Sequence, residues 1–368
     1  MPESGGKTMS ESTSPRPKAL IVLSSARVLP LSAPAGHPGI PTGFFLVELA
    51  AVMAQFENDY DFILATPDGQ LPQLDVNGLA LNFQAGGNLG LATARTTMQS
   101  GVERFSPEKL REKNPDLLKR RDTELALAHR LLGRVLVSEP LPRTDAEAVS
   151  VRGDVVAGFE ALPQREYLSI RQLIERHRDP ASDFSLADLA FVHMPGGHGP
   201  MVDFHDNPWM GELLHTLREV DVPISLICHA PIALTSARYR VDGDGTVTTD
   251  PDHGFKGARI TTVAKYGEKT VLAFNYPKVP GERTRLTYYV DVALKEADYD
   301  VNLTLNPSAA KVIWDADHSL LTGNGPQAVD EQAARLAEIV RGRAHNSPSP
   351  TRWSHPADTF RGEDRCAQ

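Results

Sequence analysis

Apolar residues along the chain follow two alternating patterns. Short continuous apolar runs are typical of buried strands, and longer stretches with apolar residues three and four positions apart are typical of helices that pack on a core. The first pattern predicts strands at residues 19–23, 60–65, 189–192, 224–227, 257–263, 311–314 and 317–326. The second predicts helices from a Thr42 cap to residue 56, and at 106–137, 167–174, 208–220, 286–295 and 329–340. The strand–helix–strand order at the start of the chain predicts a βαβ unit and a parallel sheet.

A mostly helical insertion interrupts this pattern at about residues 77–182. Around it we predict one α/β domain over residues 18–342, a flavodoxin-like three-layer sandwich with a mostly parallel sheet and helices on both faces. The flanking segments are rich in Ser, Pro and charge, so residues 1–17 are expected to be disordered and residues 343–368 to form a flexible tail. Three roles stay open for the insertion: covering the site, forming a subunit interface, or neither.

The run Ile-Ser-Leu-Ile-Cys-His-Ala-Pro, residues 224–231, combines a strand, a sharp turn and the start of a helix. A nucleophile at such a turn, here Cys228, forms a nucleophile elbow. A helix N-terminus and the neighbouring His229 imidazole both favour thiolate over thiol. The same residues are equally compatible with a buried structural cysteine, because free cysteine is among the most buried residue types.

Glu48 lies on or beside the apolar face of the first predicted helix, three residues after Phe45 and four before Val52. A buried carboxylate is costly unless it is paired or protonated. Two interpretations follow. Glu48 is either an edge side chain that reaches water or a carboxyl group held in a pocket, where a raised pKa lets it exchange a proton.

Glycines follow the strand at residues 189–192, in the sequence Met-Pro-Gly-Gly-His-Gly-Pro at 194–200. Backbone N–H groups in such a loop can hold an oxyanion, although a simple tight turn has the same composition. Several His and Asp residues lie between positions 193 and 206. Scattered loop histidines are more often surface groups than ligands, and we predict neither a metal nor a cofactor. No dinucleotide or phosphate-loop motif stands between a strand and a helix.

Composition narrows the classes of function. The 368 residues are 41% apolar and 7% aromatic, which is typical of a soluble globular protein. A formal net charge of −9 argues against nucleic acid or an anionic membrane as the main partner. With only Cys228 and Cys366, and no apolar run that suits a signal peptide or a membrane span, we predict a cytoplasmic protein without a disulfide framework.

Four motifs, in this order, resemble the PfpI/ThiJ superfamily, whose fold is like that of class I glutamine amidotransferases. They are residues 44–48, 194–200, 227–231 and 321–326. Residues 42–48, 65–69 and 196–199 look most like its stress-inducible branch of glutathione-independent glyoxalase III enzymes and holding chaperones. The chain departs from the family at Ala230, where Gly is common. No acid that would orient a histidine is evident, although Gly267-Glu268 resembles a family Gly-Glu pair.

The resemblance implies that Cys228 is the nucleophile, His229 its acid/base and Glu48 the carboxyl group that hydrogen-bonds the sulfur. The amides of Gly197 and His198 are implied to face the developing oxyanion.

The implied enzyme is a glyoxalase III-like lyase of the D-lactate dehydratase type. It converts methylglyoxal, or a related 2-oxoaldehyde, to lactate through a cysteine hemithioacetal in carbonyl-stress detoxification. The implied partner is a small carbonyl substrate, and the implied assembly is a homodimer. Two alternatives stay open: a cysteine hydrolase (amidase or peptidase) of the same superfamily, and a holding chaperone for unfolded clients.

Overall fold

A seven-stranded sheet forms the centre of the protein, which is described here by a computed structural model. The structure describes residues 16–81, 83, 111–112, 114–141, 146–274, 279, 281–306 and 308–346. Most of the two predicted tails, at residues 1–15 and 347–368, lies outside this part of the chain, as does most of residues 82–113.

The sheet consists of β8 (Leu168–Ser169), β5 (Asp61–Thr66), β1 (Lys18–Val22), β9 (Leu189–Met194), β10 (Ile224–Ile227), β17 (Leu320–Gly323) and β16 (Val312–Asp315), in that order. All neighbours are parallel except β16, which pairs antiparallel with β17 at one edge. Without β8 and β16, the strands follow the flavodoxin-like order 2-1-3-4-5. The expected α/β fold is therefore confirmed.

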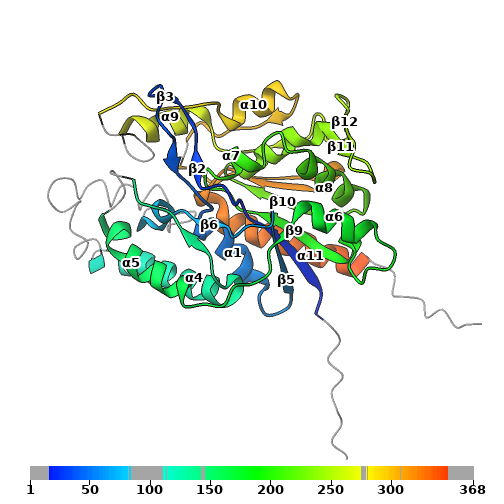
Figure 1. Cartoon of the computed structure of the whole chain (residues 1–368), viewed down its shortest axis with the longest axis horizontal. Helices are drawn as coiled ribbons and strands as arrows, with labels where there is room; N and C mark the ends of the chain where they lie inside the picture. Colours follow the sequence, from blue (N-terminus) through cyan, green and yellow to red (C-terminus); the bar gives the residue numbers. More distant parts are fainter. Residues whose placement is uncertain are drawn as a thin grey trace, which may run out of the picture.

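Helices cover both faces of the sheet because side chains of the central strands point alternately to either side. Leu20 and Val22 of β1 pack in one core cluster with residues of α6 (Ile170–Arg178) and α8 (Pro208–Glu219). Ala19 packs in another with Val52 of α1 (Leu46–Phe56) and Leu336 of α11 (Val329–Asn346). Figure 1 shows α4 (Pro115–Leu132) and α5 (Ala146–Glu160) beyond α1, at the lower left.

The remaining elements are short. They are β2 (Val28–Leu29), β3 (Leu31–Ala33), β4 (Ile40–Pro41), β6 (Gln73–Leu74), β7 (Leu136–Val137), β11 (Tyr239–Val241), β12 (Val247–Thr249), β13 (Arg259–Ile260), β14 (Arg285–Leu286), β15 (Asp300–Val301), α7 (Pro200–Asp203), α9 (Lys265–Phe274) and α10 (Val290–Glu296). The described residues also include five segments of 3₁₀ helix, at Val76–Leu79, Leu186–Asp188, Ala230–Arg238, Ala316–His318 and Pro326–Ala328. Among the described residues, no helix is both long enough and apolar enough to cross a membrane.

Several predicted element boundaries were wrong. Thr42 does not cap α1, which begins at Leu46 after Phe45, because Phe44 bonds to Gln73 and keeps the backbone extended. The helix predicted at residues 167–174 begins as strand β8 and becomes helical only at Ile170. The strand predicted at residues 257–263 shortens to the two residues of β13. Helix α9 was not predicted.

Part of the predicted insertion is integrated into the domain. Strand β8 extends the main sheet beside β5, and α4 packs on α1. Helix α6 follows β8 and begins with a capping box between Ser169 and Gln172. The flavodoxin-like core and these additions therefore share a hydrophobic cluster, which includes Leu127 of α4 and Leu49 of α1.

Candidate active site

The carboxyl ends of β9 and β10 carry the reactive groups, next to the point where the strand order reverses between β1 and β9. Cys228 directly follows β10 and has φ of 62°, which is unusual for a residue other than glycine. Its carbonyl accepts from the Thr262 hydroxyl at 2.6 Å, and its amide donates to Gly323 at 2.9 Å. These bonds hold the strained turn, as is common at functional sites.

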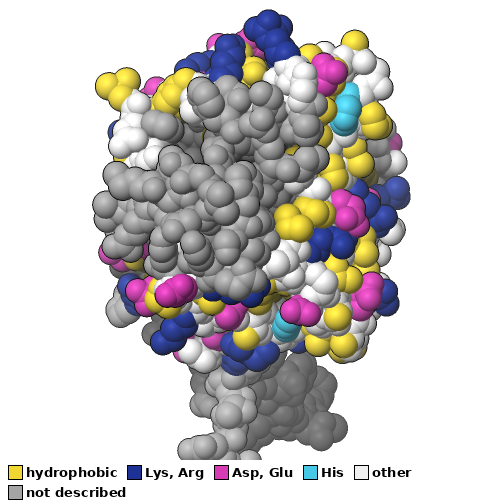
Figure 2. Space-filling view, turned by 90° about the vertical axis from the view of Figure 1, so that its left-hand side faces the viewer, with side chains coloured by type: hydrophobic (Ala, Val, Ile, Leu, Met, Phe, Trp, Pro, Cys, Tyr) yellow, Lys and Arg dark blue, Asp and Glu magenta, His cyan; other side chains and the backbone are white. Residues whose placement is uncertain are grey.

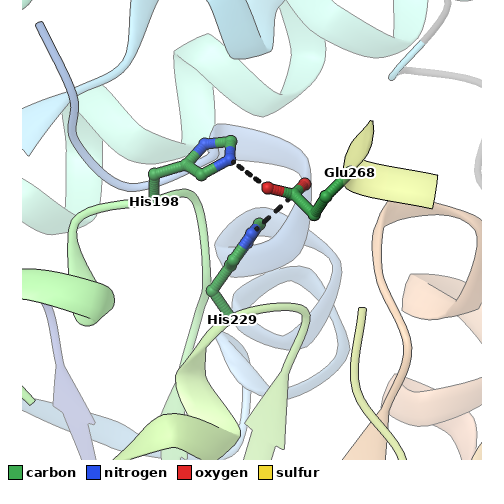
Figure 3. A group of neighbouring side chains, drawn as sticks. All are labelled: His198, His229 and Glu268. Carbon is green, nitrogen blue, oxygen red and sulfur yellow. Dashed lines mark hydrogen bonds and ion pairs between the residues drawn. The ribbon is translucent and has the colours of Figure 1, made fainter. Parts of the chain in front are cut away.

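Cys228, His229 and Glu268 form a chain of polar contacts. The Cys228 Sγ atom lies 3.1 Å from His229 Nδ1. On the other side of the ring, His229 Nε2 lies 3.4 Å from Glu268 Oε1. Glu268 lies in the first turn of α9, and Figure 3 shows its carboxylate directed at both histidines. This is the nucleophile–base–acid order of a catalytic triad, with the proton on Nε2 assigned from its carboxylate partner.

His198 shares the same carboxylate. Its Nε2 lies 3.1 Å from Glu268 Oε2, and its ring lies 4.2 Å from the His229 ring, centre to centre. All three side chains are buried. The acid that could not be identified in the sequence is therefore Glu268, and it is held between two histidines.

Glu48 approaches the thiol from the first turn of α1. Its side chain is 1% exposed, and Oε2 accepts the Gly196 amide at 2.9 Å. Glycine is required at 196, because a Cβ there would lie 2.6 Å from Cys228 Cβ and 2.7 Å from Glu48 Oε2. Of the two interpretations of Glu48, the edge side chain that reaches water is excluded, because the carboxyl group is buried.

A buried network below the site fixes the position of Glu48. His193 lies 3.0 Å from the Glu48 carbonyl oxygen through Nε2 and 3.0 Å from the Ser225 hydroxyl through Nδ1. Gln332 of α11 donates to Ser225 Oγ at 2.9 Å and to the Leu226 carbonyl at 3.0 Å. Burial lowers the pKa of His193 to about 4, so this ring is neutral and acts as a structural hydrogen-bond bridge.

Burial and neighbouring charges set different proton affinities across the site. Burial raises the pKa of Glu48 to about 7, although hydrogen bonds to Cys228 and Gly196 lower it. Burial acts to raise the pKa of Glu268, but the two histidines have the larger effect. They hold the pKa of Glu268 well below its usual value, so this carboxyl group is ionised. Glu48 therefore exchanges a proton near neutrality, whereas Glu268 stays charged.

The two histidines shift in opposite directions. Burial lowers the pKa of His198, but the Glu268 carboxylate raises it more, so the net shift is upward. Burial and then the charge on His198 lower the pKa of His229, against the effect of Glu268. His198 is therefore the cationic partner of Glu268, and His229 is the neutral imidazole that can accept a proton.

The resting thiol differs from the sequence-based expectation. Burial, and then the charge on Glu48, raise the pKa of Cys228 well above its usual value. The segment after the turn is a 3₁₀ helix, Ala230–Arg238, and its N-terminus does not outweigh these effects. Cys228 is therefore a protonated thiol at rest, and its proton must move before it can attack.

The predicted oxyanion loop lies beside the thiol. Gly197 adopts a positive φ of 81°, and its amide stabilises the ionised forms of both Cys228 and Glu48. A Cβ at Gly197 would lie 2.2 Å from the Gly43 carbonyl oxygen, so only glycine fits there. The imidazole of His198 belongs to the site through Glu268, while a role for its amide stays a prediction.

His198, His229 and Glu268 are also the one group among the described residues whose donor atoms suit a metal ion. Their donor atoms lie within 4.8 Å of one another, and two imidazoles with one carboxylate are a donor set that Zn²⁺ accepts. Of the histidines singled out near residue 200, His193 serves the network below the site, and His205 contacts Thr235.

Comparisons with known proteins give similarity at the level of fold. No family model matches the chain, and no curated protein does. The chain is similar to the solved structure of the rapid encystment protein of 24 kDa from Francisella tularensis, at 16% identity and a TM-score of 0.49, with 88% of this chain and 99% of that chain covered.

It is also similar to a glyoxalase III from Candida albicans, at 15% identity and a TM-score of 0.48, with 87% and 96% covered. A ThiJ/PfpI domain protein from Brachyspira murdochii has 8% identity and a TM-score of 0.39, with 88% and 96% covered. The fold expected from the PfpI/ThiJ resemblance is present in the strand order of the chain itself.

Proposed function

We propose that the protein converts methylglyoxal, or a related 2-oxoaldehyde, to the corresponding 2-hydroxy acid. One observation carries this proposal: a buried thiol lies between a neutral imidazole that faces a carboxylate and a second carboxyl group whose pKa is about 7. An internal redox isomerisation needs a nucleophile and two separate proton carriers. Cys228, His229 and Glu48 supply these three groups, and the sequence motifs around them resemble those of glyoxalase III enzymes.

In the first step the Cys228 sulfur adds to the aldehyde carbon, C1, while the thiol proton passes to His229 Nδ1, 3.1 Å away. The carbonyl π bond opens, and the C1 oxygen becomes an anion beside the Gly197 amide. The Glu268 carboxylate lies 3.4 Å from His229 Nε2 and supports the imidazolium that forms.

In the second step the Glu48 carboxylate takes the hydrogen on C1 as a proton, and His229 gives its proton to the oxygen on C2. The product is an enediolate. Glu48 then returns its proton to C2, and the C1 oxygen becomes the carbonyl of a thioester. Water attacks this thioester with His229 as base, which releases the 2-hydroxy acid and restores the Cys228 thiol.

The test is a comparison of the full chain with its Cys228→Ala variant in methylglyoxal consumption and lactate formation. Cys366→Ser is the control, because Cys366 is the other cysteine of the chain. We expect Cys228→Ala to lose turnover and Cys366→Ser to keep it. The proposal is wrong if Cys228→Ala consumes methylglyoxal as fast as the parent protein.

A second candidate is a cysteine hydrolase, an amidase or a peptidase. The specific observation in its favour is the order Cys228–His229–Glu268, because this geometry also supports acyl transfer to a thiol. A screen with peptides, simple amides and 2-oxoaldehydes separates the two functions. Cleavage of an amide through Cys228 without any 2-oxoaldehyde turnover favours the hydrolase.

A further inference from the structure

A basic cavity lies against the helix that carries Glu268. Its volume is about 980 Å³, and its walls include Lys265 and Lys269 of α9 together with Arg283 and Arg285. Among the described residues of the cavity wall, Glu282 is the one acid. In a chain with a formal net charge of −9, such a concentration of positive charge is a local feature of this cavity and not of the protein as a whole.

The four cations of the cavity are available to a ligand. None of them forms an ion pair within 4.0 Å of an acid in the described part of the chain. Lys265 Nζ and Lys269 Nζ lie 5.2 and 6.0 Å from the centre of the Tyr289 ring, and that ring also lines the cavity. Unpaired Lys and Arg side chains around one cavity favour a carboxylate or phosphate ligand.

Helix α9 borders both the cavity and the candidate active site. Lys265 and Leu272 line the cavity, and Glu268 lies between them at helical spacing on the same face of α9. An anion held in the cavity would therefore lie against the helix that carries Glu268.

Hydrogen-bonded strands hold the part of the cavity wall that α9 does not supply. Strand β14, with Arg285, pairs with β3, and the Ser32 hydroxyl donates to the Leu286 carbonyl at 2.8 Å. Figure 1 shows β3 and α9 next to each other at the upper left. In Figure 2, Lys and Arg side chains gather along the top of the molecule, at the height of these elements.

We propose that this basic cavity binds the anionic group, a carboxylate or a phosphate, of a substrate whose carbonyl carbon reacts at Cys228. This inference rests on the proposed function and narrows its substrate class to 2-oxoaldehydes that carry a negative charge away from the reacting carbon. Methylglyoxal, which is neutral, is then a poorer substrate than an anionic 2-oxoaldehyde.

Binding is tested first, without turnover. The full chain is titrated calorimetrically with glutarate and, separately, with inorganic pyrophosphate, so that the two anion chemistries are distinguished. Lys269→Glu and Arg283→Glu reverse charges of the cavity at exposed positions, and Lys119→Glu, exposed on α4 far from the cavity, is the matched control. We expect at least one anion to bind, with affinity at least about fivefold weaker in the cavity variants and unchanged in the control.

Reactivity is tested second, with turnover and with alkylation. The ratio of kcat/KM for 4,5-dioxopentanoate to that for methylglyoxal should exceed one and fall at least about threefold in Lys269→Glu. Alkylation of the Cys228 peptide by anionic iodoacetate should slow in the same variant relative to neutral iodoacetamide, whatever the protein catalyses.

The binding and reactivity experiments together distinguish failure of the proposed function from failure of the cavity proposal. If no 2-oxoaldehyde is turned over while anion binding and the iodoacetate preference both depend on Lys269, the proposed function fails and the cavity stands as an anion site beside Cys228. Absence of binding by either anion at millimolar concentration overturns the cavity proposal. It is also overturned if Lys269→Glu and Lys119→Glu behave alike, or if anions bind without changing either reactivity ratio.

Discussion

Glu268 holds two imidazoles with one carboxylate, and this sharing sets the proton affinities of the site. Its Oε2 faces His198 at 3.1 Å and its Oε1 faces His229 at 3.4 Å. The Glu268 carboxylate raises the pKa of His198, which becomes its cationic partner. The charge on His198 then lowers the pKa of His229, so His229 stays neutral and can accept the thiol proton. A single acid thus keeps one histidine charged and the other basic.

Replacing Glu268 by Gln should lower kcat/KM at least about 100-fold, since the imidazolium formed on His229 loses its supporting charge. The pKa of His198 should fall in the same variant, because Glu268 is what raises it. The measurements are steady-state kinetics and an NMR titration of the His198 ring. Equal kcat/KM in the parent and Glu268→Gln across the neutral range would exclude the triad role.

Glu48→Gln should have opposite effects on turnover and on alkylation. Turnover should fall because Gln cannot carry the C1 proton. Alkylation of Cys228 by iodoacetamide at pH 7 should become faster, because the negative charge on Glu48 raises the thiol pKa. A decrease of one unit in that pKa increases the thiolate fraction about tenfold. Slower alkylation in Glu48→Gln would contradict this electrostatic account.

The pH dependence of kcat follows from the same residue. The proposed isomerisation needs Glu48 as a carboxylate, and the pKa of Glu48 is raised to about 7. Activity should therefore be low at acidic pH and rise through about pH 7 in the parent protein. A rate profile recorded between pH 5 and 9 tests this, and a rate that falls across neutrality would assign the opposite protonation state to Glu48.

At the scale of single elements, Gly196 and Gly197 allow the loop after β9 to pack closely against its neighbours beside Cys228. A Cβ at Gly196 would collide with both Cys228 and Glu48, so Gly196→Ala should abolish alkylation and turnover together. Gly153, inside α5, has no atom near the position of an added Cβ, so Gly153→Ala is the matched control. It should stabilise the protein by up to about 1 kcal/mol in thermal unfolding and leave activity unchanged.

The elements that could be predicted from sequence are those with local signatures. Cys228 ends a buried strand, and Glu48 interrupts an apolar helical face, so both stand out within a few residues. In the sequence, Glu268 lies 70 positions after His198 and 39 positions after His229, and no short-range pattern encodes such contacts. Its helix does carry the same signal as Glu48, since Ala264, Glu268 and Leu272 are buried at helical spacing.

Boundaries were less predictable than the elements themselves because tertiary contacts decide them. Thr42 has the side chain of a helix cap, yet Phe44 is drawn into pairing with Gln73 and Leu74. Residues 167–169 fit a helical pattern, yet Leu168 and Ser169 pair with the edge of β5. Both segments became extended because a neighbouring strand offered hydrogen bonds.

For the whole molecule, two buried carboxyl groups with raised pKa values, Glu48 and Asp203, predict a loss of stability as the pH rises toward neutrality. Glu48 binds its proton more tightly folded than unfolded, with the pKa raised from 4.5 to about 7. The unfolded state therefore loses this proton first, and the free energy of unfolding should fall between about pH 4.5 and 7, by at most about 3 kcal/mol from this group. Asp203, also raised to about 7, acts in the same direction.

The Glu48→Gln variant should lack the part of this pH-dependent loss of stability that Glu48 causes. The variant should melt at a higher temperature than the parent at pH 8 and at a similar temperature at pH 4.5, where both states of the parent keep more of the proton. Thermal unfolding followed by circular dichroism at the two pH values is the measurement. A parent protein that is more stable than Glu48→Gln at pH 8 would contradict the pKa assignment. The predicted homodimer does not enter this comparison if both proteins are measured at one concentration.

The buried amide of Gln332 links the last helix of the described chain to the residues beneath the thiol. The proposed catalytic side chains all precede the end of α9 in the sequence. The strand before Cys228 nevertheless accepts hydrogen bonds from α11, and Val329 packs in one cluster with Cys228. During synthesis the ribosome makes α1, β9 and β10 well before α11. The nascent chain therefore carries all of the proposed catalytic groups for a period in which they lack this support, and we expect Cys228 to reach its final reactivity only after the terminal helix has emerged and docked.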